Sequence, residues 1–215
     1  MDVKIGLFIG AFVILFVIYC LFLLMRSIFK SNPLDYFKIL ELEADFKNKR
    51  FDKLSENGET ILVQAVKLGA ESLAFDIIKS GKVDVTKQAT DGTSALFYAV
   101  VCKNIKLVKA LLKAGEQVDP KKCGAFGSPL LWASRAGSIE VINLFLEKGA
   151  DINRQTTKAK YNALMGACFT LKETAISHLL SMNADKKLKN REKQTALDVY
   201  KKSGGKNNKI IEQLS

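Results

Sequence analysis

Hydrophobic residues from residue 58 onward follow a pattern that returns after 33 or 34 positions. In each copy, a short helical pattern of apolar residues is followed by a break and then by a second helical pattern. The clearest copy covers residues 127–153, where Leu130 opens the first pattern, Gly137 interrupts it and Gly149 ends the second. One copy cannot bury its own apolar faces, so the pattern predicts stacked helix–turn–helix units that cover one another.

Several classes of position keep this register along the chain. The leucines that open the first helical pattern are Leu62, Leu96, Leu130, Leu164 and Leu197. An alanine stands three positions after each of the first four leucines. The residues that close the second helical pattern are Gly81, Gly115, Gly149 and Asn183. Agreement at several positions over four or five copies predicts an all-α solenoid of about five helix–turn–helix units over residues 58–203.

The sequence around each leucine resembles the ankyrin-repeat signature Thr-Pro-Leu-His-x-Ala. Its copies are residues 60–65, 94–99, 128–133, 162–167 and, in part, 195–197. The family's ending Gly-Ala-Asp-x-Asn stands intact at residues 149–153. The histidine is replaced every time by another residue, apolar in the full copies, and only one copy keeps the proline. The resemblance covers roughly residues 55–203 and implies an ankyrin solenoid whose concave face binds partner proteins.

Residues 5–25 form an uncharged run of 21 residues between Lys4 and Arg26. A helix of that length spans about 30 Å, the thickness of a bilayer's hydrocarbon core. Cleaved signal peptides have a shorter apolar region and a small-residue cleavage site, whereas large residues close this run. The run therefore predicts an uncleaved transmembrane helix. More basic residues follow it than precede it, so the positive-inside rule predicts a single-pass membrane protein with a cytoplasmic repeat domain.

The segments on either side of the repeats are predicted to protect the ends of the stack. Residues 26–57 are expected to form a juxtamembrane linker and an N-terminal capping helix, because Leu34, Phe37 and Leu40 give a short amphipathic pattern after Pro33. A helix lying on the membrane surface is the alternative. Residues 204–215 are expected to form a C-terminal cap or a tail.

Charge and candidate chemistry narrow the functional classes. The 33 basic and 22 acidic residues give a net charge of +11, carried mostly by lysine. Such a surface suits solubility, an acidic partner, anionic lipid or nucleic acid, although base readout favours arginine over lysine. His178 is the sole histidine, and no metal-ligand motif, nucleophile set or phosphate loop accompanies it. The sequence thus predicts no enzyme, cofactor, metal site or small-molecule substrate, and nucleic acid is not the expected partner.

Aromatic residues recur where the ankyrin resemblance places the concave binding face. The candidate protein-binding residues are Tyr98, Val101, Trp132, Arg135, Tyr161 and Phe169. Exposed aromatic rings beside an arginine are typical of interface hot spots, so we expect Trp132 to be central to binding and of little importance to the fold. In the alternative, these rings fill gaps in the core.

These features together predict a membrane-anchored ankyrin-repeat scaffold for protein binding that tethers or inhibits its partner. Two alternatives stay open at this point. One is an immunity or antitoxin protein that neutralises a toxin at the membrane. The other is a basic patch that binds lipid or nucleic acid, which would show a steep dependence of affinity on salt concentration.

Overall fold

The computed structural model describes residues 33–118 and 127–215, which contain α-helices and no strand. The chain divides into two compact units, residues 1–49 and 50–215. The described part of the first unit is helix α2 (Pro33–Lys47). Leu34, Phe37 and Leu40 on this helix are exposed. The capping role proposed for residues 26–57 stays a prediction.

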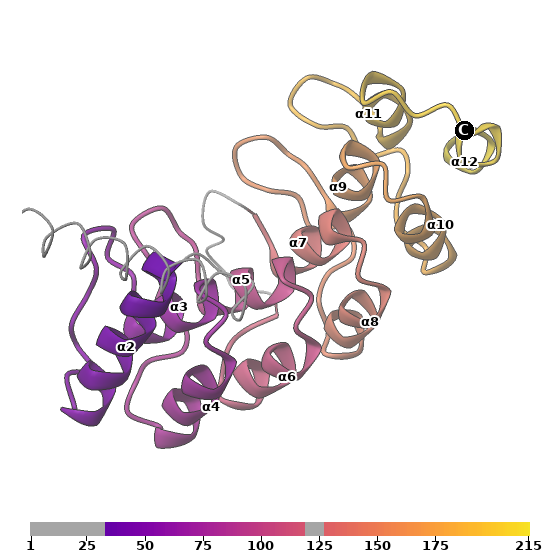
Figure 1. Ribbon diagram of the computed structural model, residues 1–215. Helices are drawn as coiled ribbons and strands as arrows, with labels where there is room; N and C mark the ends of the chain where they lie inside the picture. Colours follow the sequence, from indigo (N-terminus) through magenta and orange to yellow (C-terminus); the bar gives the residue numbers. More distant parts are fainter. Residues whose placement is uncertain (1–32, 119–126) are drawn as a thin grey trace, which may run out of the picture. The chain divides into compact units, whose positions relative to one another are not determined.

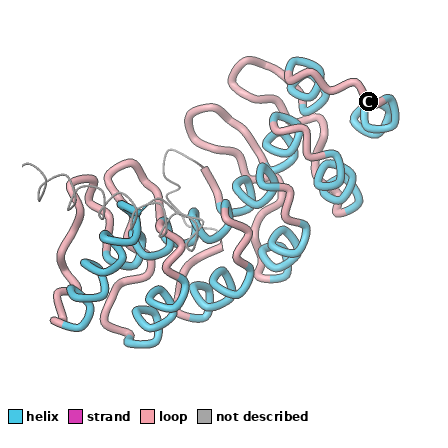
Figure 2. Tube along the Cα trace, in the orientation of Figure 1, coloured by secondary structure: helices cyan, strands magenta, loops and turns pink. Residues whose placement is uncertain are grey.

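The described residues of the second unit contain five successive helix pairs (Figure 1). The pairs are α3 (Ile61–Lys67) with α4 (Glu71–Ser80), α5 (Ala95–Val101) with α6 (Ile105–Lys113), α7 (Pro129–Ala136) with α8 (Ile139–Glu147), α9 (Ala163–Phe169) with α10 (Glu173–Ser181), and α11 (Ala196–Lys202) with α12 (Asn208–Leu214). The first helices of the pairs contact one another along one row, and the second helices form a parallel row. Loops join the pairs along the side of the first helices (Figure 2). This arrangement fits the stacked solenoid expected from the 34-residue period.

Each first helix begins at a polar residue of the repeated signature. The capping residues are Thr60, Ser94, Ser128, Asn162 and Thr195. In every case the side-chain oxygen accepts a hydrogen bond from the backbone N–H three residues later. Such caps satisfy a backbone donor that the helix itself leaves without a partner. The signature therefore fixes where each unit starts.

The core of the stack is built from the leucines and alanines of the register. The leucines of the first four units are at most 1% exposed and the alanines are fully buried. An alanine between neighbouring first helices lets their backbones approach closely, because a larger side chain would hold them apart. Leu197, in α11, is only partly buried.

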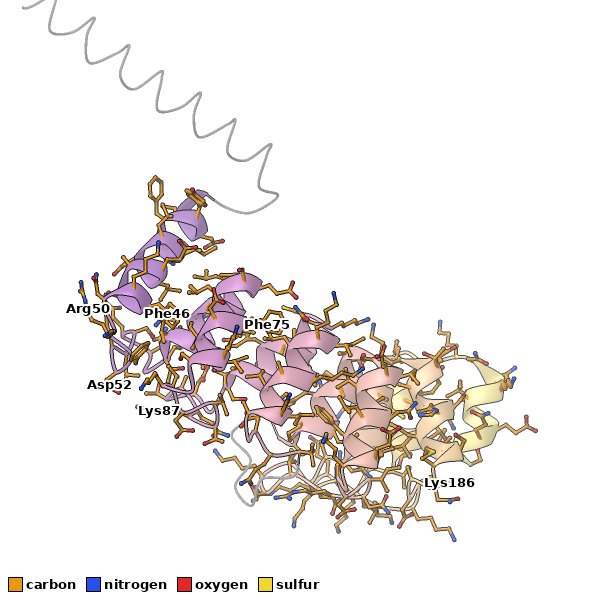
Figure 3. All side chains as sticks on the ribbon, turned by 90° about the horizontal axis from the view of Figure 1, so that it is seen from below. Phe46, Arg50, Asp52, Phe75, Lys87 and Lys186 are labelled. Atoms are coloured by element: carbon orange, nitrogen blue, oxygen red, sulfur yellow. The ribbon has the colours of Figure 1, made fainter. Side chains whose placement is uncertain are left out.

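The last helix, α12, packs against α10 and α11 through buried Ile210 and Leu214. Polar contacts hold the same end: Asn207 Nδ2 donates to Glu173 Oε2 at 2.7 Å, and the Tyr200 hydroxyl donates to Glu173 Oε1. The hydrogen bond from Tyr200 lowers the pKa of Glu173. Lys186, labelled near this end in Figure 3, donates to the carbonyl of Gln213 at 3.1 Å.

The predictions of an N-terminal transmembrane helix and of a single-pass membrane localisation are corrected by this structure. Over residues 33–118 and 127–215, no helix has both the length and the apolar composition that a membrane span requires. A span needs about 20 consecutive apolar residues, whereas α2, the longest described helix, has 15 residues and carries Asp35 and Lys47. Residues 5–25, where the span was predicted, lie outside the described residues.

Candidate protein-binding surface

One position in each first helix, five residues after the leucine of the register, faces solvent in all five units. We call these residues the exposed row: Lys67, Val101, Arg135, Phe169 and Lys202. Val101 and Phe169 are each 51% exposed, although both are apolar. Lys67 pairs with Glu59 at 2.6 Å and Lys202 pairs with Glu192 at 3.0 Å. Cationic and apolar side chains thus alternate along one side of the stack.

The position two residues after each leucine differs sharply between units. Trp132 is only 5% exposed there, and its ring meets the edge of Phe97 from the preceding unit at a centroid distance of 5.1 Å. Phe97 in turn contacts Tyr98 at 5.2 Å. We call this region, between α5 and α7, the filled step. Trp132 therefore lies in the core and not on the surface, because Phe97 in place of the signature histidine offers it an aromatic partner.

The equivalent position in the next unit is Gly166, and a pocket of about 260 Å³ lies beside it. We call this region, between α7 and α9, the open step. The pocket is lined by Leu131, Arg135, Thr156, Ala159, Tyr161, Gly166 and Phe169. A Cβ atom at Gly166 would collide with a methyl group of Leu131 and press against Cγ of Arg135. The missing side chain therefore gives these two residues their place at the pocket.

The walls of the open step combine aromatic rings with one cation. The rings of Tyr161 and Phe169 meet nearly edge to face, with centroids 6.4 Å apart. The guanidinium carbon of Arg135 lies 5.3 Å from the centroid of the Phe169 ring. Within the described residues, no carboxylate pairs with this guanidinium. The pocket is thus apolar inside and carries an uncompensated positive charge at its edge.

The loops beside the open step add positive charge. Between positions 152 and 172 the chain has no acidic residue, and its cations are Arg154, Lys158, Lys160 and Lys172. Two contacts join the loop before α9 to the loop before α11. Arg191 N donates to the carbonyl of Ala159 at 3.1 Å, and Gln155 Nε2 donates to the carbonyl of Lys189 at 2.9 Å. The rim therefore presents basic residues from two successive loops.

Of the six residues predicted to bind a partner, three are brought together around one pocket: Arg135, Tyr161 and Phe169. Val101 lies in the same exposed row, and Tyr98 is half-buried beside the filled step. The sequence interpretation gave no role to the other lining residues, Leu131, Thr156, Ala159 and Gly166. The repeat pattern alone could have indicated Gly166, because it stands at the position that Trp132 occupies in the preceding unit.

Two other residues with reactive side chains, His178 and Cys168, serve the packing of the stack. His178 Nε2 lies 2.6 Å from Oδ1 of Asn143, which joins α10 to α8. Cys168 is buried, and this burial raises the pKa of its thiol to about 12. In the parts of the chain that the structure describes, no three His, Cys, Asp or Glu side chains are grouped to hold a metal ion.

Relatives with similar sequences match only a part of this chain and a smaller part of themselves. Rat ankyrin repeat and SAM domain-containing protein 6 is 29% identical over 118 residues, which is 55% of this chain and 13% of the rat protein. Palmitoyltransferase AKR1 of Kluyveromyces lactis is 27% identical over 57% of this chain, and human palmitoyltransferase ZDHHC13 is 26% identical over 46%. Each of these matches covers 16% of the palmitoyltransferase. The likeness to both enzymes reaches this chain only through their ankyrin repeats.

A family model of three ankyrin repeats matches the chain twice, over residues 24–122 and 62–156. Together these matches cover more than half of the sequence. They agree with the signature at the start of each first helix and with the paired helices of the stack. The chain belongs to the ankyrin-repeat family, whose repeats form a module for protein–protein interaction.

Proposed function

We propose that the repeat stack binds a partner protein along the exposed row and the open step, and that it tethers or inhibits the partner by holding it there. One observation carries this proposal: three successive units have Val101, Arg135 and Phe169 at equivalent, exposed positions. Covering exposed apolar side chains with another surface contributes about 25 cal/mol for each Å² removed from water. An arginine between them is typical of interface centres.

We divide the candidate residues into those that would contact the partner and one that would hold the helices beneath them. Val101, Arg135, Tyr161 and Phe169 would touch the partner, with Tyr98 at the margin. Trp132 would act from below, because its buried ring holds the helices that present Val101 and Arg135. This division replaces the expectation that Trp132 itself is the central contact.

The row is long enough for a specific interface. Neighbouring helices pack about 8–10 Å apart, so five first helices extend over roughly 40 Å. Stable complexes bury about 800 Å² on each partner. A partner segment that covers the whole row would contact all five first helices.

The test is a comparison of captured proteins. The full chain is used as bait, in its natural form and as the double variant Val101→Asp with Phe169→Asp. We expect at least a tenfold loss of affinity for the recovered partner, measured by titration of the purified proteins. Met182→Asp is the matched control, since Met182 is 45% exposed but caps α10 in the second row. Equal binding by a folded double variant would refute the proposed surface.

A further inference from the structure

We propose that the open step recognises an acidic linear peptide segment of the partner, with a large apolar side chain in the pocket and a carboxylate two positions away on Arg135. This inference rests on the proposed function, since it names the chemistry of the segment that binds to that surface. It concerns Arg135, Tyr161, Gly166 and Phe169.

Gly166 lines the pocket, and the place of its missing side chain is taken by Leu131 and Arg135. At the equivalent position the other units have the side chains of Gln64, Tyr98, Trp132 and Val199. Beside Gly166 a volume of about 260 Å³ is open between Leu131, Ala159 and the rings of Tyr161 and Phe169. An apolar cavity of about 150 Å³ already admits benzene. The pocket is therefore large enough for a phenylalanine or leucine side chain.

The carboxylate of the peptide is inferred from Arg135, whose guanidinium lies at the pocket edge. A guanidinium offers paired N–H donors that match a carboxylate in a bidentate geometry. The ring of Phe169 lies 5.3 Å from the guanidinium carbon and holds the side chain at the pocket edge. Within the described residues its charge has no carboxylate partner. A ligand that supplies one gains an ion pair without displacing an existing one.

The spacing of two positions follows from the geometry of an extended chain. Side chains at positions i and i+2 point to the same side and lie about 7 Å apart. The guanidinium carbon of Arg135 lies 5.3 Å from the centre of the Phe169 ring, which is one wall of the pocket, so the cation stands directly at the pocket edge. An acidic residue and an apolar residue two positions apart can thus reach the cation and the pocket together.

The rim extends the preference for negative charge. Lys158 and Lys160 are exposed on either side of Ala159, and the hydrogen bond from Arg191 N to Ala159 brings the next basic loop against it. Further acidic residues around the anchor would therefore strengthen binding, and salt would weaken it.

The same charges suit single-stranded nucleic acid, but the rings do not. Such sites stack successive bases on open aromatic faces along a basic groove. Here Arg135 covers the ring of Phe169, the rings of Tyr161 and Phe169 meet at 83°, and Trp132 is buried. The observations favour a peptide.

The experiment measures fluorescence anisotropy of labelled octapeptides titrated with the full chain. The probe is Gly-Ser-Glu-Ser-Phe-Ser-Gly-Ser. Three comparison peptides have Lys for Glu, Ser for Phe, or Glu and Phe side by side, and a thymidine octanucleotide is the fourth comparison. We expect the probe to bind at least tenfold more tightly than each of the four. Arg135→Gln and Gly166→Ala should each weaken the probe at least tenfold, whereas the control Lys148→Gln, an exposed cation after α8, should change its affinity less than twofold.

Each outcome is decisive once circular dichroism shows that the variants are folded. No binding of the probe, equal binding of the lysine peptide, or tighter binding of the oligonucleotide would overturn the inference. If the double variant of Val101 and Phe169 loses its captured partner while the probe does not bind, the proposed function survives and the peptide inference fails. If both readouts are unaffected by their variants, both proposals fail.

Discussion

The filled step and the open step are built from the same positions of the repeat and differ in what those positions hold. In the filled step, Phe97 of one unit packs against Trp132 of the next. In the open step, Leu131 and Gly166 stand at the same two positions. Two large rings close the filled step, whereas in the open step Leu131 lies against the backbone of Gly166 and a pocket lies beside them. The backbone of the stack accepts both arrangements, so the residues at these two positions decide whether a step is filled or has a pocket beside it.

The comparison predicts its largest effect at Trp132. Replacing Trp132 by Ala removes a buried ring from the filled step, since this residue is only 5% exposed. Such truncations cost about 3–5 kcal/mol, as much as the 2–5 kcal/mol for Leu130→Ala. Urea denaturation of the chain, followed by circular dichroism, measures both losses. A loss below about 1 kcal/mol for Trp132→Ala would restore the surface role expected from the sequence.

A half-buried carboxyl group in the unit of the filled step, that of Glu116, gives the next largest effect. Burial raises the pKa of Glu116 from 4.5 to about 7, partly offset by a hydrogen bond with Ser94. Between pH 4.5 and 7 the unfolded chain releases this proton while the folded chain keeps it, so stability falls as the pH rises and stays level above 7. Glu116→Gln should raise the free energy of unfolding by about 1–3 kcal/mol at pH 8 and leave it unchanged at pH 4.

Unfolding free energies measured from pH 4 to 8 test this sign. The exposed Glu147 of α8 supplies the control, since Glu147→Gln should leave the fall with pH in place. A variant Glu116→Gln that keeps the same fall would mean that this carboxyl is hydrated in the folded chain.

The parts of this structure that were predictable from the sequence are those fixed by the register. The caps Thr60 and Ser94 and the buried Leu130 follow from local chemistry that each unit repeats. The burial of Trp132 could not be predicted in this way, because the direction of its side chain depends on Phe97, which lies 35 positions earlier in another unit. Side-chain direction across units is a tertiary property, and a position that is usually exposed in the family carries no information about it.

The sequence predicted several residues that line the pocket but not the pocket itself. Arg135, Tyr161 and Phe169 were selected from their positions, and the register showed Gly166 among them. The volume itself depends on how far Leu131 extends toward Gly166, which no pattern of residue types specifies. A pattern therefore predicts which residues line a face but not whether they leave a hollow.

A methyl group at Gly166 should turn the open step part of the way toward the filled one. The added Cβ would collide with a methyl carbon of Leu131 and lie 3.1 Å from Cγ of Arg135. Overpacking costs about 1–3 kcal/mol, while the gain in helix propensity over glycine returns about 1 kcal/mol. We expect a net loss of about 1 kcal/mol in the urea titration. A net gain would mean that Leu131 moves aside without strain.

The smallest effect on stability should come from Phe169, and this contrast with Trp132 separates a surface ring from a core ring. Phe169 is 51% exposed, so Phe169→Ala removes little buried area. It also removes the ring beneath the Arg135 guanidinium, an exposed contact worth about 0.5–1 kcal/mol. The urea titration should therefore show a loss of about 1 kcal/mol or less, while partner affinity falls at least tenfold. The paired measurement distinguishes the two roles, because a core residue loses stability first and a contact residue loses binding first. A loss of 3 kcal/mol at Phe169, equal to that at Trp132, would mean that both steps are core and that the pocket closes in solution.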